Sequence, residues 1–497
     1  MLFNSYEFIF VFLPVVFIGY YWLGDRSHRR SALAWLLVSS LFFYGWWNPV
    51  YLFLIAVSMA GNYSAGYYLG KHAGQSRKRS KSVLALGIIF NLGLLGYFKY
   101  TGFIIANLNN LFGFDLPARH IVLPLAISFF TFQQIAYLAD AYTGKTKEYN
   151  FLKYSLFVTF FPQLIAGPIV HHQEIIPQYS EKKTYWFDHA NLAVGLTIFT
   201  VGLFKKVMLA DNLAVYATPV FNAALEGKAL SAGAAWIGTL CYTFQIYFDF
   251  SGYSDMAIGL GRMFAIRLPL NFNSPYKAVN IIDFWRRWHM TLSRFLRDYL
   301  YFPLGGNRYG AFRQCLNMAI VMVLGGLWHG ANWTFVLWGI LHGIYLTVNY
   351  VFDILSNKWA WAQAAVMRQA GNCLTFLGVV FAWVLFRAES FPAASAVFRG
   401  MFFLNHDGYS PYEIEVNQIM AVVVSLLLVK FFPNTQEIMR DYEPTVDFDP
   451  AKMGPVTRLH KLLNWKPTVV WGLFVTVTFL ISVVNMVKAS EFIYFNF

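Results

Sequence analysis

The sequence predicts an all-α protein that crosses a membrane many times, and three observations support this prediction. Of its 497 residues, 57% are hydrophobic and only 13% are charged, which is too little polar surface for a water-soluble globule. The mean hydropathy is +0.46. Apolar stretches long enough to cross about 30 Å of hydrocarbon as a helix recur from one end of the chain to the other.

These stretches predict roughly ten to thirteen membrane-embedded helices. Their approximate ranges are 7–24, 31–46, 50–70, 83–100, 120–140, 191–210, 231–250, 316–350, 372–387, 417–432 and 467–487. The stretch 316–350 is too long for one helix. No internal repeat and no low-complexity linker divides the chain, so we expect one domain over residues 1–497.

The distribution of Lys and Arg predicts the orientation in the membrane, and this is how we interpret the formal net charge of +13. The basic residues of the first and third loops are Arg26, Arg29, Arg30, Lys71, Arg77, Lys78, Arg79 and Lys81. The connection between these loops, WWNPVY, has none. Because basic loops stay in the cytoplasm, the N-terminus is expected outside. The first apolar segment has no basic residue before it and no cleavage site after it, so we expect a retained helix.

The sequence motifs do not predict a metal site or a hydrolase. Cys241, Cys315 and Cys373 have neither a metal spacing nor a disulfide pattern, and we expect them to pack as small hydrophobic residues. HExxH, GxSxG and paired acids at glycosidase-like spacing do not occur. We therefore expect no metal site.

Two apolar segments are too irregular or too polar for simple membrane spans. FPQLIAGPIVHH, residues 161–172, contains two prolines and a glycine, so its free backbone groups must be satisfied by protein. We expect it to be a re-entrant or broken helix buried among the others. The helix predicted in 127–145 has polar residues that should face the interior of the bundle. These are Ser128, Thr131, Gln133 and Gln134.

A basic segment lies between Arg262 and Arg313, with nine Lys or Arg residues against only Asp283 and Asp298, and is expected on the cytoplasmic side. Its large apolar residues recur at three- and four-residue steps, which predicts one amphipathic helix with arginines on the remaining surface. They are Phe284, Trp288, Leu292, Phe295, Tyr299 and Phe302, and His289 falls in the same helix. Two interpretations stay open. The helix lies in the interface with its arginines at lipid headgroups, or the arginines bind the phosphates of a soluble acidic ligand.

His329 occupies the middle of an apolar run, 316–352, that must break near Gly325, Gly326 or Gly330. An ionisable residue at that depth is a candidate for function, although a neutral histidine bonded to a backbone carbonyl also serves as a structural element. We expect Asn332 to hydrogen-bond its ring. His342 is expected to pack. A buried imidazole is expected to be uncharged. It can take a proton from a hydroxyl that attacks a carbonyl, or attack the carbonyl itself.

Two long motifs carry a resemblance to a known family. FWRRWHMTLSRFLRDYLYFPLGGNR, residues 284–308, followed by GGLWHGANWTFVLWGILHG, residues 325–343, resembles the membrane-bound O-acyltransferase family. The closest resemblance is to its bacterial branch in alginate and peptidoglycan O-acetylation and teichoic acid D-alanylation. Supporting matches are YFDFSGYSDMAIGLG, NFNSPY, FPQLIAGP, LGYFKY and the terminal EFIYFNF.

The resemblance implies a ring of tilted helices around a central two-sided funnel, with His329 and His289 as the catalytic residues. It implies acetyl-CoA or a phosphopantetheinyl carrier as acyl donor from the cytoplasm, and no permanently bound cofactor. The residues expected to bind this donor are Arg286, Arg287, Arg294, Asn273, Asn332 and Trp333. The expected location is the bacterial inner membrane, among its lipids, with a separate periplasmic acetyltransferase as partner.

The function expected from these features is supply of acetyl groups for O-acetylation of an alginate-like exopolysaccharide or of peptidoglycan. FFTFQQIAYLADAY and GPIVHH look closer to the peptidoglycan-type relatives. D-alanyl transfer to teichoic acid is an alternative. A lipid-linked-sugar permease or flippase is a rival of another class, but it would show an internal repeat with paired broken helices, and we find neither.

Overall fold

The computed structural model describes residues 1–25, 28–72, 77–117, 121–146, 150–356, 365–405, 408–452, 457–486 and 492–493. In these ranges the regular elements are all helical, and the only β pairing is an isolated bridge between Leu230 and Tyr409. The predicted all-α class is confirmed. One cluster of buried apolar side chains extends from Met1 to Phe492.

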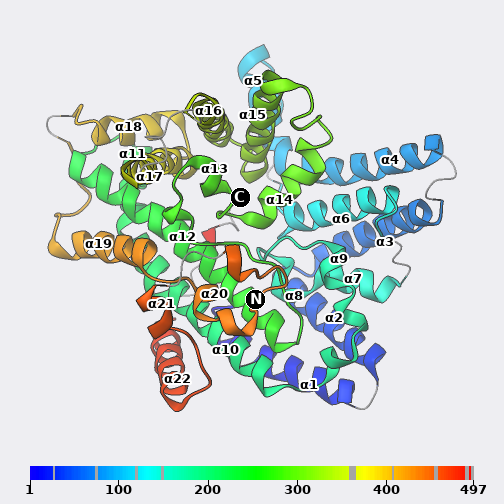
Figure 1. The fold of residues 1–497 in the computed structure, drawn as a ribbon. Helices are drawn as coiled ribbons and strands as arrows, with labels where there is room; N and C mark the ends of the chain where they lie inside the picture. Colours follow the sequence, from blue (N-terminus) through cyan, green and yellow to red (C-terminus); the bar gives the residue numbers. More distant parts are fainter. Residues whose placement is uncertain are drawn as a thin grey trace.

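Most of the first half of the chain lies in the lower and right-hand parts of the view in Figure 1. Its elements are the π-helix η1 (Phe8–Phe12), α1 (Leu13–Asp25), α2 (Arg29–Gly45), α3 (Val50–Lys71), α4 (Arg77–Leu95), the π-helix η2 (Gly96–Tyr100), α5 (Thr101–Phe112), α6 (Ile127–Tyr142), α7 (Phe151–Thr159), α8 (Phe161–Leu164), α9 (His172–Ile175), the 3₁₀ turns η3 (Gln178–Ser180) and η4 (Lys182–Tyr185), α10 (His189–Phe204), the π-helix η5 (Lys205–Ala210) and α11 (Asp211–Leu225).

The second half begins with the longest helix, α12, and includes the segments that carry both histidine motifs. Its elements are α12 (Ala232–Met263), the 3₁₀ turn η6 (Pro275–Lys277), α13 (Ile281–Trp285), α14 (Met290–Leu296), the π-helix η7 (Arg297–Tyr301), α15 (Gly310–His329), α16 (Trp333–Ser356), α17 (Ala365–Arg387), α18 (Phe391–Met401), α19 (Val416–Phe431), α20 (Thr435–Ile438), the 3₁₀ turns η9 (Arg440–Tyr442) and η10 (Pro450–Lys452), α21 (Arg458–Leu462) and α22 (Val469–Val484).

Six helical stretches of the described chain are long and apolar enough to cross a membrane, so the protein is a multi-pass membrane protein. They are Phe8–Asp25, Lys78–Phe112, His189–Leu225, Gly310–His329, Trp333–Ser356 and Val366–Arg387, and α19 and α22 are shorter apolar helices. Two of these stretches run well beyond the ranges predicted from sequence. The reason is that η2 and η5 continue the helix through a π-turn instead of ending it.

Helix α12 forms the centre of the bundle and packs against α10, α11, α17, α18 and α19 (Figure 1). Glycines let its backbone touch that of α10. A Cβ atom on Gly202 would lie 2.6 Å from the carbonyl oxygen of Gly252, and one on Gly259 would lie 2.6 Å from that of Gly195. Small residues at such a contact are the usual way for membrane helices to associate closely.

The long apolar run is divided into two antiparallel helices at Gly330, as predicted. α15 ends at His329 and α16 begins at Trp333. Gly325 and Gly326 do not break the run. They lie inside α15, and Gly326 serves the hairpin by facing the backbone of Gly339 in α16.

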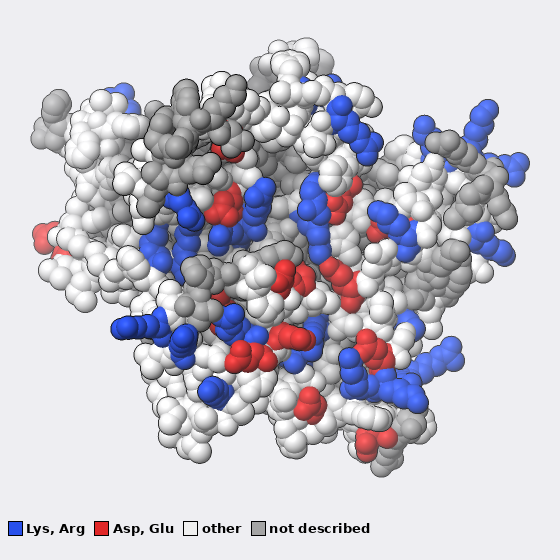
Figure 2. All heavy atoms as spheres, viewed as in Figure 1, with Lys and Arg blue, Asp and Glu red and all other residues white. Residues whose placement is uncertain are grey.

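The prediction of one amphipathic helix through the basic segment is wrong. α13 ends at Trp285 and α14 begins at Met290, and His289 between them has a left-handed backbone with φ of 44°. Four of the six apolar residues at helical spacing are buried, whereas Tyr299 is only partly buried and Phe302 is exposed. The spacing also could not predict a reversal of the backbone between two short helices. The segment lies near the middle of the view in Figure 1. Figure 2 shows Lys and Arg spread over this face, with Asp and Glu among them.

Two further expectations are confirmed. Residues 160–170 are buried and contain only the four-residue helix α8. The four polar side chains of α6 are all buried. The expectation for the cysteines is wrong for Cys373, which is exposed on α17, while Cys241 is buried and all three are free. Arg26 and most of EFIYFNF lie outside the described residues.

Gly339→Leu is expected to destabilise the protein by about 1–3 kcal/mol, because its side chain would be forced into the backbone of α15. A Cβ atom there already lies 2.9 Å from the Cα atom of Val323. Thermal unfolding of the purified protein in detergent measures the effect. Gly472→Leu on α22 is the control, because nothing lies within 4 Å of its Cβ position. Equal unfolding temperatures for the two variants would refute this account of the hairpin.

Candidate active site

His329 is the last residue of α15 and is 3% exposed. Aromatic rings surround its imidazole. The ring centroid lies 4.9 Å from that of Trp328, 5.2 Å from that of Trp338 and 5.1 Å from that of Phe386. The chain thus holds this polar ring within an apolar cage at a break between two membrane helices.

His289 is fully buried at the junction of α13 and α14. Left-handed backbone is uncommon for a residue other than glycine and persists only where surrounding contacts enforce it. Its ring packs edge-on against Phe250 at 4.7 Å, and its Nδ1 atom lies 3.2 Å from the Oδ1 atom of Asn271.

Asn271 holds this junction together. Its Oδ1 atom also accepts a hydrogen bond from the hydroxyl of Thr291 at 2.9 Å, and its carbonyl oxygen accepts one from the N–H of Met290 at 3.0 Å. Its Nδ2 group donates to Ser254 of α12 at 3.2 Å. Asn271 was not among the predicted site residues, although the NFNSPY motif contains it.

The structure brings the two predicted histidines together around Trp328. The ring of Trp328 lies 6.3 Å from that of His289 and 4.9 Å from that of His329. Trp338 in turn packs against His342, with ring centroids 4.7 Å apart. His342 is buried, and its Nδ1 atom accepts a hydrogen bond from the indole N–H of Trp285 at 3.3 Å.

Lys99 belongs to this site and was not predicted as a site residue. Its ammonium group donates hydrogen bonds to the carbonyl oxygens of Trp328 and, at 3.2 Å, of His329. The signal in the sequence was a lysine inside a predicted membrane span, within the LGYFKY motif. A prediction based only on histidines and basic clusters does not include Lys99.

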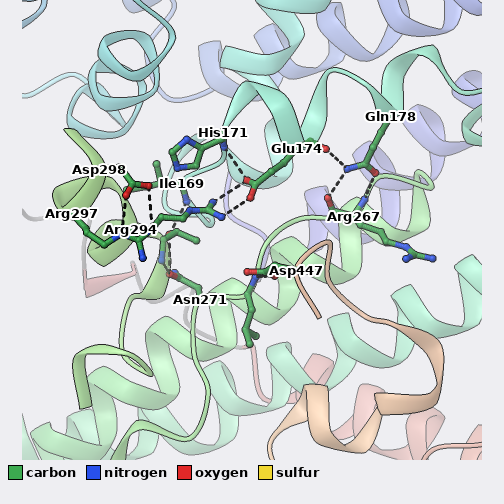
Figure 3. Close-up of polar contacts among 12 residues, drawn as sticks. Ile169, His171, Glu174, Gln178, Arg267, Asn271, Arg294, Arg297, Asp298 and Asp447 are labelled. Atoms are coloured by element: carbon green, nitrogen blue, oxygen red, sulfur yellow. Dashed lines mark hydrogen bonds and ion pairs between the residues drawn. The ribbon is translucent and has the colours of Figure 1, made fainter. Parts of the chain in front are cut away.

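Two of the three predicted donor-binding arginines form ion pairs within the protein. Arg294 donates hydrogen bonds to Glu174 through both terminal nitrogens of its guanidinium group, Nη1 and Nη2, with Nη2 2.9 Å from Oε2 (Figure 3). The Nε atom of Arg287 lies 2.8 Å from Oδ1 of Asp283. Arg286, by contrast, is exposed.

The Arg294 pair is part of a polar layer that links the loops of this face (Figure 3). Glu174 also accepts a hydrogen bond from the N–H of His171 at 3.1 Å. Asp447 accepts one from the N–H of Leu270 at 2.9 Å. Burial raises the pKa of Asp447, and that hydrogen bond and Arg294 act in the opposite direction. Arg294 therefore ties α14 to α9.

Of the remaining predicted donor residues, Asn273 lies beside Arg287, whose carbonyl oxygen accepts a hydrogen bond from the N–H of Asn273 at 2.9 Å, whereas Asn332 and Trp333 contact other segments. The amide of Asn273 accepts a hydrogen bond from Asn434, while the indole of Trp333 donates to Asn107. Asn332 donates to the carbonyl oxygen of Glu389 and caps the start of α16. Its bond to the ring of His329 stays a prediction.

Asn332 and Trp333 are also distant from the exposed arginine. Trp285, the residue before Arg286, donates a hydrogen bond to His342 of α16 at 3.3 Å. His342 lies nine residues beyond Trp333, which is about 14 Å along an α-helix. Asn332 and Trp333 therefore lie away from the segment that carries Arg286. Among the described residues, no group of three His, Cys, Asp or Glu side chains could hold a metal ion.

Comparison with known proteins shows to which family the chain is similar. The profile of the membrane-bound O-acyltransferase family matches residues 5–391. The chain is 46% identical to the peptidoglycan O-acetyltransferase of Helicobacter pylori, over 82% of this chain and 80% of that one. It is 38% identical to the probable alginate O-acetylase AlgI of Pseudomonas putida over the whole of both chains. Identity to the teichoic acid D-alanyltransferase of Bacillus subtilis is 27%, over 55% of this chain and 71% of that one.

The chain belongs to the membrane-bound O-acyltransferase family, and it is an acyltransferase. The resemblance predicted from the two histidine motifs is confirmed. The permease alternative finds no support in these relatives.

Asn271→Ala is expected to lower acyl transfer by about 10- to 100-fold, because His289 and Thr291 lose the oxygen atom that orients the junction between α13 and α14. Turnover per folded protein is the measurement. Ser254→Ala is the matched control, since it removes only the bond to the Nδ2 group of Asn271. An Asn271→Ala enzyme as active as the Ser254→Ala enzyme would rule out this role.

Proposed function

We propose that the protein takes an acetyl group from a cytoplasmic thioester and passes it across the bacterial inner membrane for O-acetylation of a cell-envelope or secreted polysaccharide. The observation that carries this proposal is the pair of buried histidines, His289 and His329, which both pack against the ring of Trp328 in a chain of the acyltransferase family. Both are proposed as catalytic residues.

The buried imidazole of His329 has two ways to promote transfer. As a general base, it takes the proton of the acceptor hydroxyl while the hydroxyl oxygen attacks the thioester carbonyl. As a nucleophile, a ring nitrogen attacks that carbonyl and forms an acyl-imidazole, which the hydroxyl then attacks. In both routes the carbon–sulfur bond breaks, the thiol leaves with a proton and a new ester bond forms.

The proposed donor is acetyl-CoA or a carrier protein with a phosphopantetheinyl arm, and no cofactor is permanently bound. Among the three arginines predicted to bind its phosphates, Arg286 is the best candidate because its side chain is exposed. Arg287 and Arg294 are committed to Asp283 and Glu174. A phosphate at Arg286 leaves the flexible arm of the donor to reach inward.

The acceptor is proposed to approach from the periplasmic side, with the N-terminus of the chain outside. A separate periplasmic acetyltransferase would complete the transfer. Identity to the peptidoglycan relative, 46%, exceeds the 38% to the alginate relative. This difference, together with FFTFQQIAYLADAY and GPIVHH, favours peptidoglycan over an alginate-like polymer. Lower similarity to the teichoic acid relative makes D-alanyl transfer the weaker alternative.

His329→Ala is expected to abolish envelope O-acetylation in cells that depend on this chain, while the protein still accumulates in the membrane. The reason is that this substitution removes the imidazole that accepts the proton or carries the acetyl group. Acetate released by mild base from purified peptidoglycan and from secreted polysaccharide measures the effect and identifies the acceptor. His289→Ala should cause a strong loss. Normal acetylation by a well-expressed His329→Ala protein would refute the catalytic assignment.

Arg286→Ala is expected to weaken binding of labelled acetyl-CoA without lowering the unfolding temperature, because this exposed side chain has no carboxylate hydrogen-bonded to it among the described residues. Arg287→Ala is the comparison. It leaves Asp283 without its partner and should therefore lower stability as well. Unchanged acetyl-CoA binding by the Arg286→Ala protein would exclude this residue from the donor site.

A further inference from the structure

Lys99 places a cationic group inside a membrane-spanning stretch. It lies in η2, within the stretch Lys78–Phe112, and its side chain is only partly exposed. A charged side chain at such a position is costly and needs a compensating interaction. Neither the proposed acyl transfer nor the donor site described above uses it.

The contacts of Lys99 converge on one feature, the carboxyl end of α15. Its Nζ atom donates hydrogen bonds to the carbonyl oxygens of Trp328 and His329, and it lies 3.4 Å from the hydroxyl of Ser128. The neighbouring Tyr100 donates to the carbonyl oxygen of Leu327 at 2.8 Å. Two consecutive residues of η2 thus bind three consecutive carbonyl groups in the last turn of α15.

These carbonyl groups need partners for a simple reason. The last four carbonyls of an α-helix have no partner within the helix, and within a membrane no water is guaranteed to replace it. The carboxyl end of a helix is also the negative end of its dipole, so a cation is the favoured partner. π-turns such as η2 occur frequently at functional sites.

The charge of Lys99 is directed to this helix end and not to an acid. Among the described residues, no carboxylate forms an ion pair with it, whereas Lys205 and Lys206 pair with Asp255 and Asp249. Its Nζ atom also lies 5.8 Å from the centre of the Trp328 ring. Lys99 therefore contacts the backbone of His329 and both the backbone and the ring of Trp328, the residue against which the two histidines pack.

We propose that Lys99 is a positioning residue for His329. By binding the terminal carbonyls of α15, its ammonium group keeps the last turn closed and holds the imidazole where the acetyl group is transferred. The inference rests on the proposed role of His329 in acyl transfer. Displacement of a reacting group by about 1 Å can cost about 100-fold in rate, so a small change at this helix end has a large effect.

The test compares Lys99→Met, which keeps the side-chain length but removes charge and donors, with Lys99→Arg, which keeps both. Release of CoA from acetyl-CoA by each purified full-length variant, in the presence of acceptor-containing membranes, measures kcat and KM. For Lys99→Met we expect kcat to fall by about 100-fold while the KM for acetyl-CoA stays within about twofold. Lys99→Arg should retain at least about a tenth of the original kcat, since a cation again reaches the carbonyls.

Asn91→Leu is the control for stability on the neighbouring helix α4. Asn91 exchanges hydrogen bonds with Asn62, with donor–acceptor distances of 2.6 Å and 3.2 Å, and makes no contact with the carboxyl end of α15. This variant should lower the unfolding temperature while kcat per folded protein is retained. A fall in kcat of Asn91→Leu equal to that of Lys99→Met would mean that lost stability explains both, and would overturn the proposal.

The other variants decide the question. Unchanged kcat for Lys99→Met, or equal losses for Lys99→Met and Lys99→Arg, would overturn the positioning role. If Lys99→Met does not accumulate, Lys99→Gln replaces it, and unchanged kcat for that variant would overturn the role as well. His329→Ala in the same assay distinguishes a failure of the proposed function from a failure of the inference about Lys99. Activity of His329→Ala refutes the proposed function itself, whereas an inactive His329→Ala beside a fully active Lys99→Met refutes only the inference about Lys99.

Discussion

The candidate site depends on the buried carboxyl end of one helix. α15 terminates at His329, which is 3% exposed, so its last carbonyl groups must find partners within the protein. Lys99 and Tyr100 supply those partners from η2, and this contact fixes the helix end relative to α4 and α5. The position of His329, the cage of rings around it and its distance from His289 all follow from where this helix end is held.

Around that constraint, the bundle combines close backbone packing with buried polar contacts. Glycines at the α15–α16 and α10–α12 contacts bring the helices near enough for their backbones to touch. Asn271 then joins the loop before α13 to α12 and to the left-handed residue His289. Because each of these contacts is short and directional, both histidines pack against Trp328 although they are forty residues apart in sequence, one at the junction of α13 and α14 and the other at the end of α15.

Prediction from the sequence succeeded for features that depend on the length of apolar stretches and on the hydrogen-bonding needs of the backbone. It placed the break of the long apolar run next to His329, and it placed the polar residues of α6 and the segment 161–172 inside the bundle. It failed where a local reversal interrupts a regular pattern. The apolar residues of the basic segment kept helical spacing across His289, so the separation of α13 from α14 had no signature in periodicity. Pairing of Arg294 with Glu174 was equally invisible, because the two residues are 120 positions apart in sequence.

The sequence by itself determined that this is an all-α membrane protein of the O-acyltransferase family, with His289 and His329 as its candidates for chemistry. Composition, span length and contiguous motifs are properties of the chain, and they need no knowledge of which segments meet. Only the tertiary structure decided that the histidines share Trp328, that Arg286 is the exposed one of the three predicted donor-binding arginines, and that Lys99 binds the last carbonyl groups of α15. Those facts depend on contacts between distant segments, and the carbonyl groups that Lys99 binds are present in every residue, so no residue pattern could single them out.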